Sequence, residues 1–133
     1  MIYAMDASAL VALLRNEPGA EVVRQLLRDT TNTCFAHAVN LCEVYYGFAR
    51  ALGEPAAQSV VQDLCAVRIL PREDMDQPFW QDVGRLKAEG RISLADCFGI
   101  ALARRVGGEL VTSDHHELDP ILPLGLCSVR FIR

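Results

Sequence analysis

The chain has 133 residues, of which 51% are hydrophobic, and its 17 acidic and 13 basic side chains give a formal net charge of −4. This length predicts one domain, residues 1–133, whose core needs neither disulfides nor a structural metal, and no apolar run approaches the roughly 20 residues that span a bilayer. The negative net charge disfavours a polyanionic partner that is bound only by bulk electrostatic attraction. Asp6 interrupts the apolar start of the chain, so we expect no signal peptide and a cytoplasmic location.

Short apolar runs alternate with amphipathic segments along the chain, and glycine or proline separates many of them. The apolar runs predict strands at residues 1–5, 33–39, 67–70, 109–113 and 127–132, the third of which is stopped by Pro71. The amphipathic segments predict helices at residues 8–16, 20–29, 40–53, 55–66, 75–89 and 93–106. Strands separated by helices imply right-handed crossovers, so the sequence predicts an α/β fold with a mainly parallel sheet covered by helices on both faces.

Four acidic residues, Asp6, Glu43, Asp96 and Asp114, are expected at the place where such a sheet binds ligands. Each of the first three is the only charge in an apolar segment. Asp6 ends the first predicted strand and Asp114 follows the fourth, whereas Glu43 and Asp96 fall in the first turns of two predicted helices. Because the binding crevice of an open α/β sheet lies beyond the carboxyl ends of its strands, we expect the four acids to converge there.

Glu43 and Asp96 also have a simpler interpretation. The segments N-L-C-E and S-L-A-D resemble capping boxes, in which Asn40 or Ser93 caps a helix and the acid three residues later reaches back to a backbone N–H. Capping does not explain Asp6, however, and the helix after Asp96 is apolar almost all round, which predicts that it is buried.

Carboxylates gathered in a semi-buried cleft repel one another and lose hydration, so they must protonate, separate or share cations. Hard oxygen ligands without thiolate or imidazole favour Mg²⁺ or Mn²⁺. Such a site suits phosphodiester hydrolysis, because the metal would polarise the phosphate and lower the pKa of a bound water. Two alternatives stay open: a phosphatase that uses the same acids on small phosphoesters, and a non-catalytic interaction module whose acids only cap helices.

Four segments stand in an order and spacing that are typical of one family: DASALVALLRNEPGAEVV, AVNLCEVYYGFAR, ISLADCFGIALA and LVTSDHHELDP. They resemble the PIN-domain family, and within it the VapC-like ribonuclease toxins of toxin–antitoxin pairs. The resemblance extends over nearly the whole chain. It implies a PIN-like three-layer α/β/α sandwich, a Mg²⁺- or Mn²⁺-dependent endoribonuclease acting on RNA, a homodimer, and inhibition by a cognate antitoxin protein.

The same resemblance implies roles for individual residues. The catalytic metal ligands would be Asp6, Glu43, Asp96 and Asp114, and the supporting polar residues would be Ser8, Asn40, Ser93 and Thr112. The segments SALVALL and VVRQLL would supply the walls of an apolar groove for an amphipathic antitoxin segment.

Two further residues, His115 and Arg91, are candidates for contact with substrate phosphate. A solvated surface position is the simpler interpretation of Arg91. The segment DHHELD would offer ligands for a separate transition metal, but it lacks the H-E-x-x-H spacing, and a polar turn accounts for it more simply.

Overall fold

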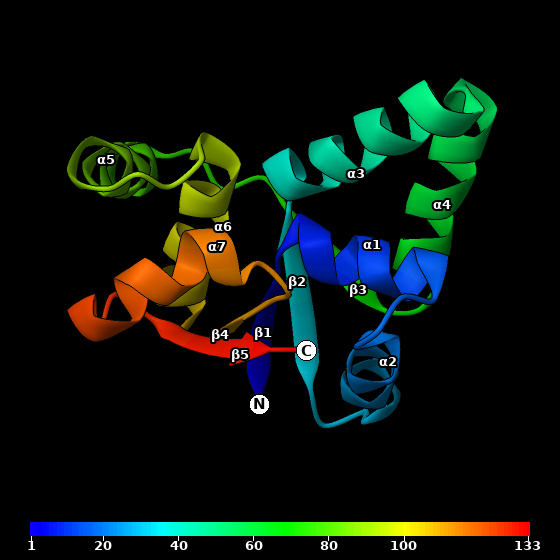
Figure 1. Ribbon diagram of the computed structural model, residues 1–133, viewed down its shortest axis with the longest axis horizontal. Helices are drawn as coiled ribbons and strands as arrows, with labels where there is room; N and C mark the ends of the chain where they lie inside the picture. The colour runs from blue at the N-terminus through cyan, green and yellow to red at the C-terminus, as the bar shows by residue number, and fades with distance from the viewer.

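Five short strands form a central sheet in the order β3-β2-β1-β4-β5, and each strand runs parallel to its neighbours. The structure is a computed structural model that describes all residues from 1 to 133 (Figure 1). The strands are β1 (Ile2–Met5), β2 (Thr33–His37), β3 (Ile69–Arg72), β4 (Glu109–Thr112) and β5 (Ser128–Phe131). The mainly parallel sheet that the sequence predicts is therefore confirmed.

Helices cover both faces of this sheet (Figure 1). One face carries α1 (Ala7–Arg15), α2 (Ala20–Arg28), α3 (Ala38–Leu52) and α4 (Glu54–Ala66). The other carries α5 (Gln77–Glu89), α6 (Leu94–Val106), the short α7 (His115–Leu118) and a 3₁₀ segment, η1 (Asp119–Leu124). Each layer has its own apolar cluster, centred on residues such as Leu10 and Leu64 in the first and Ile100 and Leu110 in the second. The structure thus confirms the three-layer α/β/α sandwich, and none of its helices combines the length and apolar character needed to cross a bilayer.

Two element boundaries differ from the sequence prediction for physical reasons. Helix α3 starts at Ala38 rather than at Asn40, because the ring of His37 acts as the N-cap and its Nδ1 accepts a hydrogen bond from the Val39 N–H at 3.1 Å. Strand β3 continues through Pro71 instead of stopping there, because β3 is an edge strand that pairs only with β2 and tolerates a missing N–H.

Residues 114–119, predicted as a polar turn, belong instead to helical structure. Helix α7 begins after Asp114, whose Oδ1 accepts a hydrogen bond from the Glu117 N–H at 3.0 Å. Leu118 is completely buried in the second apolar cluster, so the segment is anchored to the sheet rather than solvated.

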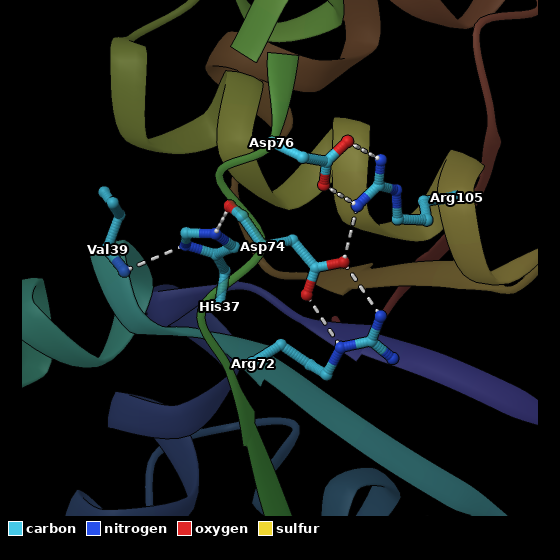
Figure 2. A network of polar contacts seen from close by, with 6 residues as sticks. All are labelled: His37, Val39, Arg72, Asp74, Asp76 and Arg105. Carbon is cyan, nitrogen blue, oxygen red and sulfur yellow. Dashed lines mark hydrogen bonds and ion pairs between the residues drawn. The ribbon is translucent and has the colours of Figure 1, made fainter. Parts of the chain in front are cut away.

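A charged network fixes the start of α3 relative to α6 (Figure 2). Asp74, in the loop between β3 and α5, accepts two hydrogen bonds of 2.8 Å from Arg72 and one of 3.0 Å from Arg105 of α6. Arg105 also pairs with Asp76. The buried ring of His37 lies 2.9 Å from the Asp74 carbonyl oxygen; because its Nδ1 accepts from Val39, its Nε2 carries the proton and donates it. The network therefore joins the carboxyl end of β2 to α6.

The two guanidinium groups hold the pKa of Asp74 well below its usual range, Arg72 having the larger effect. A carboxylate with a lowered pKa stabilises the fold above the pKa of its unfolded form, about 4, and this stabilisation is lost as the pH falls below that value. We expect Asp74→Asn to lower the free energy of unfolding at pH 7 by about 2 kcal/mol, and the difference from wild type to shrink towards pH 3.

Urea denaturation at both pH values checks this expectation. Glu73→Gln, which neutralises the adjacent exposed acid that makes no ion pair, is the matched control and should stay close to wild type at both. A loss of stability in Asp74→Asn that is the same at pH 7 and pH 3 would contradict the role of its charge.

Candidate metal centre at the carboxyl edge of the sheet

The candidate site lies where the order of the strands reverses. The chain places β2 and β3 on one side of β1 and then crosses to place β4 and β5 on the other, so the reversal falls between β1 and β4. Ligands of open α/β sheets bind in the crevice at such a point, beyond the carboxyl ends of the strands. Asp6 directly follows β1, and Thr112 ends β4.

Asp6 is 3% exposed and its carboxylate is held by three hydrogen bonds. Its Oδ1 accepts from the Ala7 N–H at 2.8 Å, and its Oδ2 accepts from the hydroxyls of Ser8 and Thr112, each at 2.8 Å. The Thr112 hydroxyl in turn accepts from the Asp114 N–H at 3.0 Å. Ser8 and Thr112, expected from the sequence to be supporting residues, therefore orient Asp6 and connect it to the segment that carries Asp114.

Three carboxylates gather beside Asp6. One oxygen from each of Asp96, Asp114 and Glu117 lies within 4.8 Å of the others, and we call these three residues the acid cluster. Asp96 comes from the first turn of α6 and is 6% exposed, Asp114 caps α7, and Glu117 belongs to α7. No other group of histidine, cysteine or acidic residues meets the same distance criterion, so the DHHELD segment forms no separate site.

Glu117 is the member that the sequence analysis missed. Its Oε2 accepts a hydrogen bond of 2.6 Å from the Ser93 N–H, which brings α7 against the start of α6. The available signal was the spacing of Asp114 and Glu117, three residues apart, which is that of a helix start with an acid in its first turn. A helix of four residues is too short to show apolar periodicity, so the sequence pattern of this segment does not distinguish it from a turn.

The capping interpretation holds for Ser93 but for neither acid. The Ser93 hydroxyl accepts from the Asp96 N–H at 3.2 Å, yet the reciprocal contact to the Ser93 N–H comes from Glu117. The Asp96 carboxylate therefore has no capping role. For Glu43 the interpretation is wrong, because Asn40 is not the N-cap of α3.

The electrostatics of the site connect four of its acids. Burial, and after it the negative charge of Asp6, raises the pKa of Asp96 to about 9. Burial also raises the pKa of Glu43, again with the charge of Asp6 as the next cause, while the amide of Asn40 and the hydroxyl of Tyr46 act in the opposite direction. Glu43 lies outside the acid cluster but within electrostatic reach of Asp6. The hydrogen bond from Ser93 lowers the pKa of Glu117, so this acid stays ionised.

Asn40 carries a buried oxygen without a partner. Its side chain is completely buried between α3 and α6, where its Nδ2 donates to the Ala95 carbonyl at 3.1 Å while its Oδ1 has no hydrogen-bond partner. Buried polar atoms without a partner are rare in folded proteins and call for a ligand or an ordered water. The acids offer only oxygen ligands, which fit a hard divalent cation, and their donor set contains no sulfur or imidazole that would favour a softer metal.

The two residues predicted to contact substrate occupy different environments. Both ring nitrogens of His115 are engaged, Nδ1 with Asp119 at 3.0 Å and Nε2 with the Arg133 carbonyl at 2.8 Å, and the ring stacks on Phe131. These contacts give His115 a structural role at the carboxyl end of the chain. Arg91 is exposed in the turn between α5 and α6.

Comparison with known proteins gives one family and several similar structures. A family model described as the PIN domain matches residues 3–119. VapBC2 from Rickettsia felis, bound to a promoter DNA fragment, matches with a TM-score of 0.75 at 20% identity over 98% of both chains. DNA-bound VapBC from Salmonella typhimurium matches with a TM-score of 0.76 at 16% identity over 100% of this chain and 99% of that one.

VapC20 from Mycobacterium tuberculosis, described as a sarcin–ricin loop cleaving toxin, matches with a TM-score of 0.69 at 16% identity over 90% of this chain and 95% of that one. No curated protein sequence gives a match. At these identities the structural similarity establishes the fold.

Asp96 and Asp6 differ in their hydrogen bonds, so we expect that neutralising each of them changes the stability of the protein by a different amount. Asp96 is buried without a capping contact, whereas Asp6 would lose a hydrogen-bond acceptor on conversion to an amide. In EDTA, Asp96→Asn should therefore be more stable than wild type by about 1 kcal/mol, as is common when a strained functional residue is replaced. Asp6→Asn should gain less.

Thermal melting in EDTA and in millimolar Mn²⁺ checks this. A cation that binds the folded state should raise the wild-type melting temperature, and it should raise that of Asp96→Asn less. Glu73→Gln, an exposed acid outside the site, should behave as wild type in both buffers. If Mn²⁺ shifts all three proteins equally, Asp96 does not belong to a metal site.

Proposed function

The chain belongs to the PIN domain family, and on that premise we propose that it is a Mg²⁺- or Mn²⁺-dependent endoribonuclease and the toxin of a toxin–antitoxin pair. The observation that carries the proposal is the acid cluster beside the buried Asp6, at the reversal of the strand order. The similarity in fold to VapBC complexes and to a toxin described as cleaving the sarcin–ricin loop supports the same activity.

A divalent cation would be held by Asp6, Asp96 and Asp114, with Glu117 as a further ligand, and would supply charge neutralisation, polarisation of the phosphate and a lowered pKa for the attacking water. The chain's own contribution is to orient these oxygens in advance. Asp6 is aligned by Ser8 and Thr112, and Asp96 is free because Glu117 takes over the contact to the Ser93 N–H.

One carboxylate must accept the proton that leaves the attacking water. Glu43 fits this role because burial raises its pKa towards neutrality and because it stands apart from the acid cluster. A base whose pKa lies nearer the working pH accepts a proton more effectively than a fully acidic carboxylate.

Asp96→Asn tests the catalytic role most sharply, because the amide keeps the shape of the side chain but loses its charge. We expect the rate of oligoribonucleotide cleavage in Mn²⁺ to fall at least about 100-fold, as is usual when an electrostatic contact to a reacting phosphate is lost. Glu117→Gln should also reduce the rate, although its amide oxygen can still accept from the Ser93 N–H and keep the fold.

Glu73→Gln is the control and should cleave as wild type does. Asp96→Asn that retains more than about a tenth of the wild-type rate would exclude the proposed role. Assay of a small phosphomonoester in parallel separates the second candidate: turnover of that compound without cleavage of RNA would favour a phosphatase.

A groove on the face of the molecule that carries α1, α2 and α4 supports the proposal of an antitoxin partner. It has a volume of about 440 Å³, lies between α1, α2 and α4, and is lined by leucines that include Leu13, Leu14, Leu27 and Leu64. Three arginines and one aspartate stand at its margin. An apolar groove with a mainly basic margin fits an amphipathic helix that carries acidic residues beside its apolar face.

Leu14→Glu should prevent co-purification with the product of the adjacent gene and leave RNA cleavage intact, because Leu14 lines the groove and lies outside the acid cluster. Trp80→Glu, at an exposed apolar side chain of α5 away from both the groove and the acid cluster, should still co-purify. Co-purification of Leu14→Glu at the wild-type level would remove the groove from the proposal.

Light scattering of the free protein checks the proposed homodimer, which has twice the 14.7 kDa of one chain.

A further inference from the structure

A chamber of about 490 Å³ adjoins the acid cluster and has no role in the mechanism described so far. It lies between the α5–α6 turn and the α7–η1 segment, and it is lined by Arg91, Ile92, His116, Glu117, Ile121 and Leu124, with a glycine and a proline beside them. Glu117 belongs both to the chamber and to the acid cluster. A ligand that enters the chamber therefore reaches the site of the carboxylates.

Arg91 is the one basic side chain of the protein without a partner. Each of the other eleven arginines and Lys87 makes an ion pair, a hydrogen bond to a carbonyl oxygen or a contact with an aromatic ring. Arg91 makes none of these and stands at the chamber with His116, which is exposed. A free guanidinium at the mouth of a chamber next to a phosphodiester site is suited to a phosphate oxygen.

The chamber also has apolar lining residues. Ile92 and Ile121 are buried, whereas Leu124 is 67% exposed, so part of this apolar lining faces solvent. Apolar side chains, like aromatic ones, can pack against the face of an unstacked base. The volume lies within the range of about 300–1,000 Å³ that is usual for small-ligand pockets, which is enough for one nucleotide.

We propose that this chamber binds the nucleotide adjoining the scissile phosphate of the RNA, with its phosphate at Arg91 and its base against Ile121 and Leu124. The inference rests on the proposed function, because it assumes that RNA is cut at the acid cluster. An RNA strand held there must continue along the surface, and the chamber that shares Glu117 with the cluster receives its next nucleotide. Arg91, predicted from the sequence as a possible phosphate contact, thereby gains a specific site, and His116 rather than His115 is the histidine beside it.

The first test measures RNA binding apart from cleavage. In an Asp96→Asn background, fluorescence anisotropy with an oligoribonucleotide that wild type cuts should show about a tenfold higher Kd for Arg91→Gln. The slope of log affinity against log salt should fall by about 0.7, the value for one phosphate contact on a single strand. Arg85→Gln, which removes an exposed arginine outside the chamber, is the matched control and should leave both quantities unchanged.

The second test uses Leu124→Ser in the active protein, with RNA that carries an abasic nucleotide beside the cleaved bond. In wild type the abasic substitution should lower kcat/KM about tenfold, the order expected for one stacked base. In Leu124→Ser the intact RNA should already be cut about tenfold less well, and the abasic substitution should have little further effect. Since Arg91 and Leu124 are exposed, both variants should fold, which thermal melting confirms.

The outcomes separate this inference from the proposed function. If wild type cleaves RNA and Asp96→Asn does not, but Arg91→Gln binds like Arg85→Gln and the abasic effect is equal in wild type and Leu124→Ser, the chamber has no role and the nuclease stands. If wild type neither binds nor cleaves RNA, both proposals are overturned.

Discussion

Negative charge buried at the carboxyl edge of the sheet is the constraint on which the rest of the site depends. Taking a carboxylate out of water costs several kcal/mol unless hydrogen bonds or opposite charge replace its hydration. For Asp6 that replacement is present in the fold itself, because Ala7, Ser8 and Thr112 all donate to it. For Asp96 it is not, and burial together with the charge of Asp6 raises its pKa to about 9. A cation shared with Asp114 and Glu117 would supply the missing compensation, so the same arrangement that destabilises the free protein prepares it to bind a metal.

The two faces of the molecule divide the proposed contacts between them. The groove proposed for an antitoxin lies among α1, α2 and α4, whereas the chamber proposed for a nucleotide lies beside α7 and η1. Figure 1 shows these two groups of helices on different sides of the sheet. An antitoxin helix seated in the groove alone would leave both the chamber and the acid cluster open. Inhibition then requires a second segment that crosses the sheet edge and places an Arg or Lys among the acids, where a charged hydrogen bond is strongest. If both proposals hold, this division keeps the surface for the antitoxin separate from the surface for the RNA.

The sheet and the positions of two of its acids could be predicted from the sequence, because the end of a strand is visible in the local pattern and also fixes a position at the edge of the sheet. Asp6 and Asp114 follow apolar runs, and parallel strands bring their carboxyl ends to one edge. Other features depend on contacts distant in the sequence. Glu117 joins the acid cluster through the Ser93 N–H, 24 residues away. The start of α3 depends on His37, whose ring is hydrogen-bonded to the carbonyl of Asp74, 37 residues away. Histidine is also a less common N-cap residue than Ser or Asn. The passage of β3 through Pro71 depends on its place at the edge of the sheet.

Anomalous diffraction from crystals soaked in Mn²⁺ measures whether these buried carboxylates share a divalent cation. If they do, an anomalous peak lies within about 2.0–2.6 Å of carboxylate oxygens of Asp96 and Asp114, with further ligand oxygens from Asp6 or Glu117, and crystals of Asp96→Asn show no such peak. A wild-type soak that shows Mn²⁺ only at surface acids such as Glu73, with no ion beside Asp96, would mean that the carboxylates do not share a cation.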